Sequence, residues 1–333
     1  MKRILVTGAC GSVGFALTKK LIDQGNVVCA LDNNEDAIFR LKSYFDNTDG
    51  KNLMRYFLGD VRDLNRLEQA FQGVSEVYHC AALKHVELCE YNPTEALKTN
   101  IEGTQNVIKS AYASNVSKVI LASSDKAVNP TSVMGTSKLF CEKLIIAAND
   151  MYQSTGVKFS CVRFGNVWNT NGSVGQIFRN QVRNGKNLTL TDPNMTRFFI
   201  SIDAATQLCV DACDAMIGGE IFVAHMVASS MELIAKEFIE HNHKLRYEVI
   251  GTKPGEKLFE ELFTETESLR TYNFKGLYVI LPPVLRDDIG RHSELLKKYT
   301  FGQLPNNKAL RSDTCDQSET EIKKMVLDIM HAS

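Results

Sequence analysis

The sequence lacks any apolar stretch approaching the roughly 20 residues that a membrane-spanning helix requires. Its start, MKRILVTGAC, is basic and then apolar, as in a secretory signal peptide. The apolar part is too short for such a signal, however, and it runs directly into glycines. We therefore expect a cytoplasmic protein that does not bind membranes.

An excess of charge of either sign is also missing. Lysine and arginine total 38 and aspartate and glutamate total 39, so that the formal net charge of the 333 residues is −1. This balance argues against nonspecific binding to nucleic acid. The 44% hydrophobic and 23% charged residues are typical of a globular protein, and the length is sufficient for a large buried core.

Patterns that indicate metal sites or disulfides are absent as well. The nine cysteines include no CxxC pair, and several lie within apolar segments such as VVCAL and FSCVRF. Cys209 and Cys213 have i, i+4 spacing, but no histidine pair accompanies them, and we expect the HNH segment at 241–243 to be an exposed helix end. We predict reduced thiols and no metal site.

Segments typical of strands and helices alternate through the first half of the chain. The strand-like segments are 4–8, 26–32, 54–60, 76–82, 118–124 and 158–167, and the helical ones include 14–25, 94–115 and 136–156. Near-continuous apolar strands that alternate with helices predict an α/β fold with a doubly wound, Rossmann-type parallel sheet, covered by helices on both faces.

Beyond the last of these strands the pattern changes to turn-rich segments and shorter helices, which predicts a smaller α/β C-terminal domain for the substrate. We assign residues 1–168 to the first domain, together with a returning segment near 200–224. Its helix, 203–219, has the pattern of one that packs onto the main sheet. Residues 169–199 and 225–333 are assigned to the second domain.

A glycine-rich turn follows the first predicted strand and opens the first predicted helix. In the segment TGACGSVG, Gly8 permits the tight turn, Gly11 lets the backbone approach a pyrophosphate at the positive end of the helix, and Gly14 lets helix and strand pack closely. Ser12 and Val13 complete the turn. The position between a strand and a helix gives the motif its meaning, which is a dinucleotide-binding site.

An acidic residue, Asp32, closes the second predicted strand. A carboxylate there accepts hydrogen bonds from both ribose hydroxyls of NAD and repels the 2′-phosphate of NADP. No arginine follows among the next four residues to neutralise such a phosphate, so NAD is favoured over NADP. The order of the βαβ units places Asp60 and Val61 at the adenine pocket, and Ala81 and Ala82 beside the cofactor.

Several longer segments carry a resemblance to a known family. They are GDVRD (59–63), AALKHVELCEYNPTEALKTNIEGTQNV (81–107), SSDKAVNPTSVMGTSK (123–138), RFGNV (163–167), MTRFF (195–199), PGEK (254–257) and LRSDT (310–314). Together with the glycine-rich turn, they resemble extended short-chain dehydrogenases/reductases. They look most like the UDP-N-acetylglucosamine 4,6-dehydratases of bacterial polysaccharide and flagellin-sugar synthesis, over nearly the whole chain.

The resemblance implies catalytic roles for five residues. Ser124, Asp125 and Lys126 match a strand-end triplet in which Ser or Thr holds the sugar, Asp serves as acid and Lys as base. Lys138 matches the lysine of a YxxxK motif, whereas Met134 stands where that motif has its tyrosine. Some dehydratases of the family are similar to this chain in carrying Met at that place.

The reaction that the resemblance implies is a loss of water from a hexose. The C5 proton becomes removable once C4 is oxidised to a ketone, and hydride moves to NAD and later returns to C6, so that NAD is recycled. Such a site needs a base and an acid. Because the thioether of Met134 is at most a weak acceptor, we expect Asp125 to take the C4 hydroxyl proton and deliver it to the C6 hydroxyl. Lys138 would orient the nicotinamide ribose, and Lys126 must lose its proton by desolvation or transfer.

Four further residues are candidates for substrate binding. Asn166 and Arg197 resemble residues that grip the diphosphate and uridine of a UDP-sugar, and the fork of an arginine suits a diphosphate. Lys84, with the neighbouring His85, and Glu256 of the PGEK segment match family positions that would line the substrate site.

Two alternative functions remain open. A nucleotide-sugar 4-epimerase or reductase on the same scaffold needs only hydride transfer at C4, normally with the tyrosine, and Met134 beside Asp125 and Lys126 argues against it. A non-catalytic NAD-binding protein is disfavoured because Asp125, Lys126 and Lys138 are all present. The long helices at 94–115 and 136–156 predict a homo-oligomer, a dimer or higher, because this family usually assembles through such helices.

Overall fold

The structure is a computed structural model that describes residues 1–170, 172–240, 244–283, 289–299, 302, 308–315 and 318–331. The HNH segment at 241–243 therefore lies outside the described residues. No helix in the described ranges is both long and apolar enough to cross a membrane. No disulfide joins any of the nine cysteines, all of which lie in the described part.

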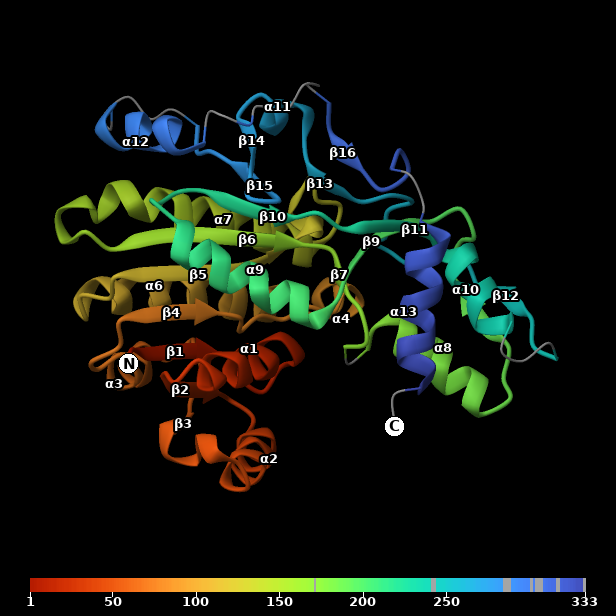
Figure 1. The fold of residues 1–333 in the computed structure, drawn as a ribbon, viewed down its shortest axis with the longest axis horizontal. Helices are drawn as coiled ribbons and strands as arrows, with labels where there is room; N and C mark the ends of the chain where they lie inside the picture. Colours follow the sequence, from red (N-terminus) through yellow and green to blue (C-terminus); the bar gives the residue numbers. More distant parts are fainter. Residues whose placement is uncertain are drawn as a thin grey trace.

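A nine-stranded sheet forms the centre of the molecule, with the strand order β14-β15-β10-β6-β5-β4-β1-β2-β3 (Figure 1). The strands from β3 to β10 in this order run parallel, and the β14–β15 hairpin is antiparallel to β10. The strand bounds are β1 Arg3–Thr7, β2 Val27–Asp32, β3 Met54–Leu58, β4 Glu76–His79, β5 Lys118–Ser124, β6 Lys158–Phe164, β10 Ile221–Ala224, β14 Thr271–Phe274 and β15 Leu277–Ile280. The doubly wound α/β fold is confirmed.

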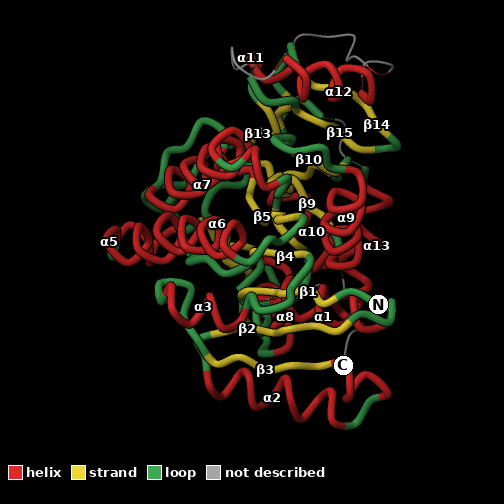
Figure 2. Tube along the Cα trace, turned by 90° about the vertical axis from the view of Figure 1, so that its left-hand side faces the viewer, coloured by secondary structure: helices red, strands yellow, loops and turns green. Residues whose placement is uncertain are grey.

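Helices cover both faces of this sheet (Figure 2). The helices of one face are α1 (Ser12–Asp23), α2 (Glu35–Asp46) and α9 (Ile202–Ala215), and those of the other are α3 (Leu64–Ala70), α6 (Gly103–Ala113) and α7 (Val133–Met151). Successive β1 residues alternate between them: Ile4 and Val6 belong to one hydrophobic cluster and Leu5 to the other. Because both faces are buried, the strands are apolar at almost every position.

The segment predicted as one helix over 94–115 is divided in the structure. It consists of α5 (Pro93–Ala96), a π-helical stretch η2 (Leu97–Glu102) and α6. Gly103 follows the π-helical stretch, and a Cβ there would lie 2.7 Å from Cγ2 of Val61. At this point α6 therefore lies close to the loop after β3, at the carboxyl end of the parallel strands.

A second lobe has a hydrophobic core of its own, which includes Trp168, Phe178, Phe238 and Val326. It contains α8 (Val174–Arg183), α10 (Met231–Glu240), α13 (Glu319–His331) and two small sheets. The sheets are formed by β8 (Leu188–Leu190) with β12 (Tyr247–Val249), and by β7 (Asn166–Val167), β9 (Thr196–Ile200) and β11 (Val227–Ser230). The remaining elements are η1 (Asp49–Leu53), α4 (Val86–Tyr91), η3 (Asp125–Ala127), η4 (Gln153–Thr155), β13 (Glu261–Phe263), α11 (Glu265–Ser268), α12 (Ile289–Tyr299) and β16 (Leu310–Arg311).

The hairpin β14–β15 corrects one part of the domain assignment. Residues 271–280 were assigned to the second domain, but they pair with β10 and extend the large sheet. Their apolar side chains, among them Val279 and Ile280, belong to the clusters of that sheet. The helix α12 packs there too, because its Leu295 and Tyr299 belong to one of these clusters. Conversely, β7 and Trp168, which were assigned to the first domain, belong to the second lobe. We propose the rest of the division as stated, with these segments moved.

Candidate active site

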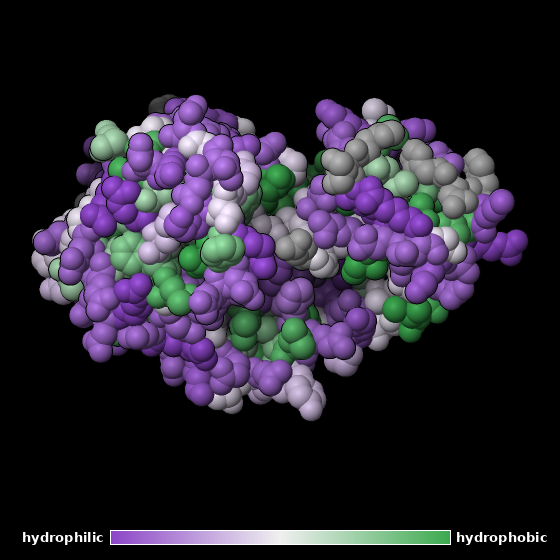
Figure 3. Space-filling model, turned by 90° about the horizontal axis from the view of Figure 1, so that it is seen from below, coloured by the Kyte–Doolittle hydropathy of each residue, from purple (hydrophilic) through white to green (hydrophobic). Residues whose placement is uncertain are grey.

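A cleft of about 890 Å³ lies between the two lobes, and Figure 3 shows the hollow from below. Residues that follow β1, β2, β3, β4 and β5 line one side, and residues of the second lobe line the other. This is the carboxyl end of the parallel strands, where open α/β sheets bind their ligands. The predicted site residues that line it are Gly8, Gly11, Ser12, Val13, Gly14, Asp32, Asp60, Val61, Ala81, Ala82, Lys84, Ser124, Lys126, Met134, Lys138, Asn166, Arg197 and Glu256.

The glycine-rich turn is packed too closely for side chains. Gly8 has a φ of +66°, and a Cβ on it would lie 2.7 Å from the Cα of Ala81; a Cβ on Gly14 would lie 2.1 Å from the carbonyl oxygen of Gly8. Gly11 precedes α1, and no side chain caps this helix. The positive end of α1 is thus left to an anionic ligand, as a dinucleotide-binding turn requires.

The two acidic residues predicted to contact a cofactor are held in place by the loops around them. Asp32 accepts hydrogen bonds from the backbone N–H of Cys10 at 3.0 Å and of Asn34 at 3.1 Å. Asp60 accepts from Arg62 Nη2 at 2.7 Å. Burial would raise the pKa of Asp60, but the hydrogen bonds from Arg62 outweigh it and hold that pKa below its ordinary value. Both side chains are therefore fixed in orientation, as contacts to a ribose and an adenine require.

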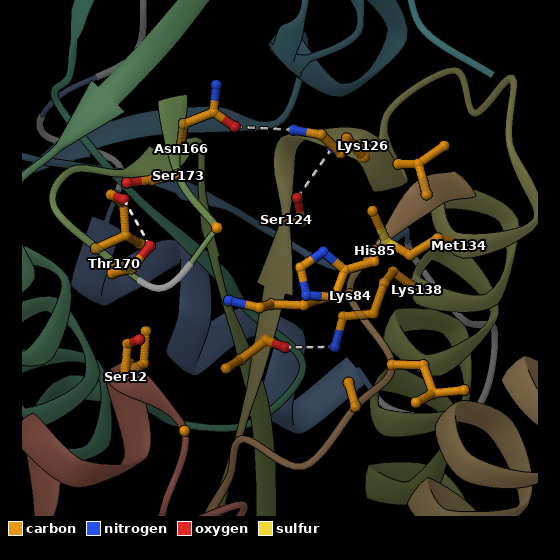
Figure 4. A pocket seen from close by; sticks show the side chains of 18 of the residues that line it. Ser12, Lys84, His85, Ser124, Lys126, Met134, Lys138, Asn166, Thr170 and Ser173 are labelled. Carbon is orange, nitrogen blue, oxygen red and sulfur yellow. Dashed lines mark hydrogen bonds between the residues drawn. The ribbon is translucent and has the colours of Figure 1, made fainter. Parts of the chain in front are cut away.

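The predicted catalytic triplet lies at the end of β5 and in η3. The Ser124 hydroxyl donates to Oδ1 of Asp125 at 2.8 Å, and Nζ of Lys126 donates to the same oxygen at 3.0 Å. Lys126 also donates to Oδ1 of Asn166 at 3.1 Å (Figure 4). This last bond joins the end of β5 to β7 and therefore ties the two sides of the cleft together.

Asp125 is the predicted site residue that does not line the cleft, because its side chain is fully buried. Its Oδ1 is bound by Ser124 and Lys126, whereas Oδ2 has no hydrogen-bond partner among the described residues. Ser124 does line the cleft. The carboxylate of Asp125 is therefore connected to the cleft through the serine hydroxyl.

Met134 and Lys138 lie one helical turn apart on α7 and face the cleft together (Figure 4). Lys138 donates to the carbonyl oxygen of Ala122 at 2.6 Å, and this hydrogen bond fixes its side chain against β5. Met134 packs with Cys89 and Ala96 in a small apolar cluster. Among the described residues no tyrosine lines the cleft, so no other tyrosine takes the place that Met134 occupies.

The predicted substrate residues differ in how much of their polar surface remains available. Burial lowers the pKa of Lys84 below its ordinary value. Glu256 closes its own turn by accepting from the backbone N–H of Lys253 at 3.0 Å. Arg197 is buried, with Nη1 donating to the carbonyl of Thr196 at 2.8 Å and Nη2 contacting the sulfur of Met195 at 2.7 Å. Its fork is thus turned towards its own strand.

Glu260 and Asn100 are two buried polar residues, one in the cleft wall and one behind it, that the sequence did not single out. Glu260 lines the cleft but is 3% exposed. Asn100, in the π-helical stretch, donates to Oγ of Ser137 at 2.8 Å and accepts from the backbone N–H of Leu83 at 2.8 Å. The NxxGT spacing within the predicted helix was the available signal for Asn100, whereas Glu260 stands in a run, KLFEE, that shows nothing of its surroundings.

Comparison with known proteins identifies the family. Residues 4–282 match the family described as polysaccharide biosynthesis protein. The chain belongs to this family. The predicted resemblance to extended short-chain dehydrogenases/reductases of the UDP-N-acetylglucosamine 4,6-dehydratase type is thereby confirmed.

Three relatives in the family are similar over most of the chain. An inverting UDP-N-acetylglucosamine 4,6-dehydratase of Campylobacter jejuni is 39% identical over 286 residues, which is 85% of this chain and 84% of the relative. A UDP-glucose 4-epimerase of Rickettsia rickettsii is 39% identical over 84% of this chain and 82% of the relative. An uncharacterized membrane protein of Methanocaldococcus jannaschii is 43% identical and covers 84% and 86%.

Two solved structures have a fold similar to that of this chain. Pen from Bacillus thuringiensis superimposes with a TM-score of 0.90 at 34% identity and covers 100% of this chain and 98% of its own. The dTDP-glucose 4,6-dehydratase DesIV of Streptomyces venezuelae, with NAD and TYD bound, has a TM-score of 0.69 at 20% identity and covers 77% and 86%. The second likeness concerns the fold alone.

Proposed function

We propose that this member of the polysaccharide biosynthesis protein family is a UDP-N-acetylglucosamine 4,6-dehydratase, a hydro-lyase that retains NAD and serves bacterial-type glycan or nonulosonate biosynthesis. The observation that carries the proposal is the Ser124–Asp125–Lys126 chain, which opens into the same cleft as the dinucleotide turn. The name of the Campylobacter relative supports the substrate. The product would be a UDP-4-keto-6-deoxy-N-acetylhexosamine.

The residues on the cofactor side fit NAD. Cβ atoms on Gly8 and Gly14 would collide with backbone, and Asp32 presents a fixed carboxylate to a ribose and repels a 2′-phosphate. Val61, Ala81 and Ala82 would line the adenine and nicotinamide ends, and Lys138 would hold the nicotinamide ribose. When bound, the cofactor accepts a hydride from C4 and returns it to C6.

A proton relay through Ser124 replaces direct contact between the sugar and Asp125. A C4 hydroxyl that donates to Ser124 Oγ passes a proton along the 2.8 Å hydrogen bond to Asp125. Asp125 later returns this proton by the same route to the departing C6 hydroxyl. Lys126, at the edge of the cleft, removes the C5 proton, and Met134 forms an apolar wall that takes no proton.

The diphosphate and uridine of the substrate would lie against the second lobe. Asn166 offers a polar group there, Lys84 offers one from the first lobe, and Glu256 also lines the cleft. Arg197 has committed most of its fork to Thr196 and Met195, so we assign it to shaping this wall and its charge. A paired grip on the diphosphate by Arg197 would require its side chain to turn.

One assay tests the proposal against its alternatives. The protein is incubated with UDP-N-acetylglucosamine in deuterated water, and the sugar is followed by NMR and mass spectrometry, while the NAD content is measured after denaturation. Loss of water with a C4 keto, C6 methyl product supports the dehydratase. An isomer without loss of water supports a 4-epimerase, which the Rickettsia relative's name favours. Unchanged sugar with bound NAD indicates a non-catalytic protein.

A further inference from the structure

A second buried carboxylate lies beside the proposed base. Glu260 immediately precedes β13 and is fixed by its backbone, which donates to Ser312 Oγ at 3.0 Å and accepts from the Ser312 N–H at 2.9 Å. Its Oε1 is 3.9 Å from Nζ of Lys126. Lys126 is therefore in ion-pair range of two carboxylates, because Oδ1 of Asp125 lies 3.0 Å from the same nitrogen.

The carboxylate of Glu260 lies near several cations but makes few hydrogen bonds. Arg197 Nε is 3.9 Å from Oε1 and Lys257 Nζ is 3.6 Å from Oε2. Oε2 has no hydrogen-bond partner among the described residues. The three cations favour the charged form of Glu260, whereas burial opposes that form, and Oε2 is the oxygen at which a proton can bind.

The protonation of Lys126 is the difficulty in the proposed mechanism. Burial alone would lower the pKa of its ammonium, but the carboxylates of Asp125 and Glu260 outweigh both burial and the nearby Arg197 and hold that pKa above its ordinary value. The amide of Asn166 also faces it. Lys126 thus begins as an ammonium, and an ammonium cannot remove a proton from C5.

We infer that Glu260 is a positioning residue that stores the ammonium proton of Lys126 while Lys126 acts as the base. The inference rests on the proposed function. Asp125 cannot fill this role, because it already carries the C4 hydroxyl proton at that stage. Glu260 is then the remaining carboxylate in ion-pair range of Lys126 among the described residues.

The proton steps balance over one cycle. When the C4 hydroxyl proton reaches Asp125, Lys126 loses its nearest anion, and its ammonium proton moves to Glu260, which gives a neutral amine and a carboxylic acid. The amine takes the C5 proton, and Asp125 protonates the C6 hydroxyl, which leaves as water. After Lys126 has returned a proton to C5, Glu260 gives the stored proton back to Lys126.

The burial of Glu260 supports this path. Burial raises the pKa of its carboxyl above the ordinary value, and the attraction of Lys126, Arg197 and Lys257 does not cancel that rise. The 3.9 Å separation exceeds a hydrogen bond, but it joins a lysine with several rotatable bonds to a fixed acid. Proton-transfer contacts are often long before substrate binds and tighten in the complex.

The test compares Glu260→Gln with the parent protein across pH, using UDP-N-acetylglucosamine. The glutamine keeps the shape but cannot store a proton, so Lys126 must release its proton to water. We expect kcat at pH 7 to fall by about 100-fold with KM little changed, and the defect to shrink to about tenfold or less near pH 9.5. Glu260→Asp should recover part of the loss. Glu261→Gln, one residue away with its carboxylate bound to Asn129 at 2.7 Å, is the matched control. A loss that is equal at every pH, or no loss, overturns the inference.

A measurement without turnover separates this inference from the proposed function. The Cε resonance of Lys126, assigned by its disappearance in Lys126→Met, is titrated in both proteins by NMR. Removal of one neighbouring anion should lower the midpoint of Lys126 by at least about one pH unit in Glu260→Gln. An unchanged midpoint shows that Glu260 does not govern the proton of Lys126, whatever sugar the protein accepts. If the midpoint of Lys126 differs between the two proteins as expected, but the parent protein leaves the sugar unchanged, only the proposed function is rejected.

Discussion

At the scale of single residues, Ser124 separates the buried carboxylate of Asp125 from the cleft. If the serine hydroxyl relays the proton, Ser124→Ala should lower kcat by about 100- to 1,000-fold while bound NAD is retained. Asp125→Asn should abolish turnover with NAD still bound. Because the two groups act as one unit, the double variant should be little worse than Asp125→Asn. Steady-state kinetics and the NAD content of the purified variants provide the measurement.

Ser43→Ala is the control for the serine substitution, because Ser43 is exposed on α2 and donates to the carbonyl of Phe39 within that helix. It should match the parent in rate. A Ser124→Ala protein that turns over at the parent rate would mean that the sugar reaches Asp125 by another route.

The ribose contact of Asp32 can be tested in the same way. Each carboxylate oxygen already accepts one backbone N–H and keeps a lone pair for a ribose hydroxyl. We expect Asp32→Ala to weaken NAD binding by about 10- to 100-fold, because hydrogen bonds to a charged group are lost. The ratio of the affinities for NAD and NADP should also become smaller, because the carboxylate no longer repels a 2′-phosphate. Calorimetry with both dinucleotides measures the two affinities.

Asp36→Ala removes a carboxylate from the first turn of α2, which is the helix that follows Asp32, and should leave both affinities unchanged. Equal binding of NAD and NADP by the parent protein would contradict the role assigned to Asp32.

The site residues that were predictable are those whose role follows from local context. The glycine-rich turn and the SSDK segment each lie at the end of an apolar strand, so fold topology alone brings them to one edge of the sheet. Glu260 could not be found in this way, because its relation to Lys126 depends on how the second lobe folds back. The orientation of Arg197 was also hidden, since a sequence does not show whether an arginine fork faces a ligand or its own backbone.

At the scale of elements, the contact between β1 and α1 depends on glycine at position 14. A Cβ there would lie 2.1 Å from the Gly8 carbonyl oxygen. Gly14→Ala should therefore lower the free energy of unfolding by about 1–3 kcal/mol or more, as overpacking does, and abolish NAD binding because the turn must shift. Urea denaturation and NAD content measure the two effects.

Gly25→Ala makes the same substitution where a Cβ would meet nothing within 4 Å, although its φ of +78° is unfavourable for alanine. This substitution should lower the free energy of unfolding by about 1–2 kcal/mol and leave NAD binding intact. If both variants lost NAD equally, a general loss of stability would explain the result, and the close contact at Gly14 would not be responsible.

The helices and strands of the first lobe were largely predictable, because buried parallel strands and amphipathic helices have distinct apolar periods. The helices α2 and α3 were not predicted, and 94–115 was predicted as one helix because its apolar period is continuous although its backbone winding changes. The change to π-helical winding at Leu97–Glu102 is associated with tertiary contacts of Asn100 to Leu83 and Ser137. Such contacts override local propensity and leave little trace in the pattern.

At the scale of the whole molecule, the helices on one face of the sheet leave apolar side chains exposed. On the stretch from η2 to α7, Leu97 is 46%, Tyr112 41%, Phe140 50% and Met151 71% exposed. These belong to the two helical segments for which we predict assembly, and a surface that exposes large apolar side chains is typical of an interaction site. We expect a homodimer through this surface, with Phe140→Glu weakening the association by at least about 100-fold. Light scattering after size exclusion measures the mass.

Phe39→Glu provides the comparison, because Phe39 is 69% exposed but lies on α2, at the other end of the sheet. It should leave the mass of the dimer unchanged. A parent protein that remains monomeric at high concentration would contradict the prediction.

The order of strands also has a consequence for the chain as it is being synthesised. β6 ends at Phe164, whereas its neighbour β10 begins at Ile221 and the closing hairpin ends at Ile280. At about 5–20 residues per second, a ribosome needs roughly 3 to 11 seconds to make the residues between β6 and β10. During that interval the nascent first lobe exposes an apolar strand edge, which is the kind of surface that aggregates or recruits chaperones.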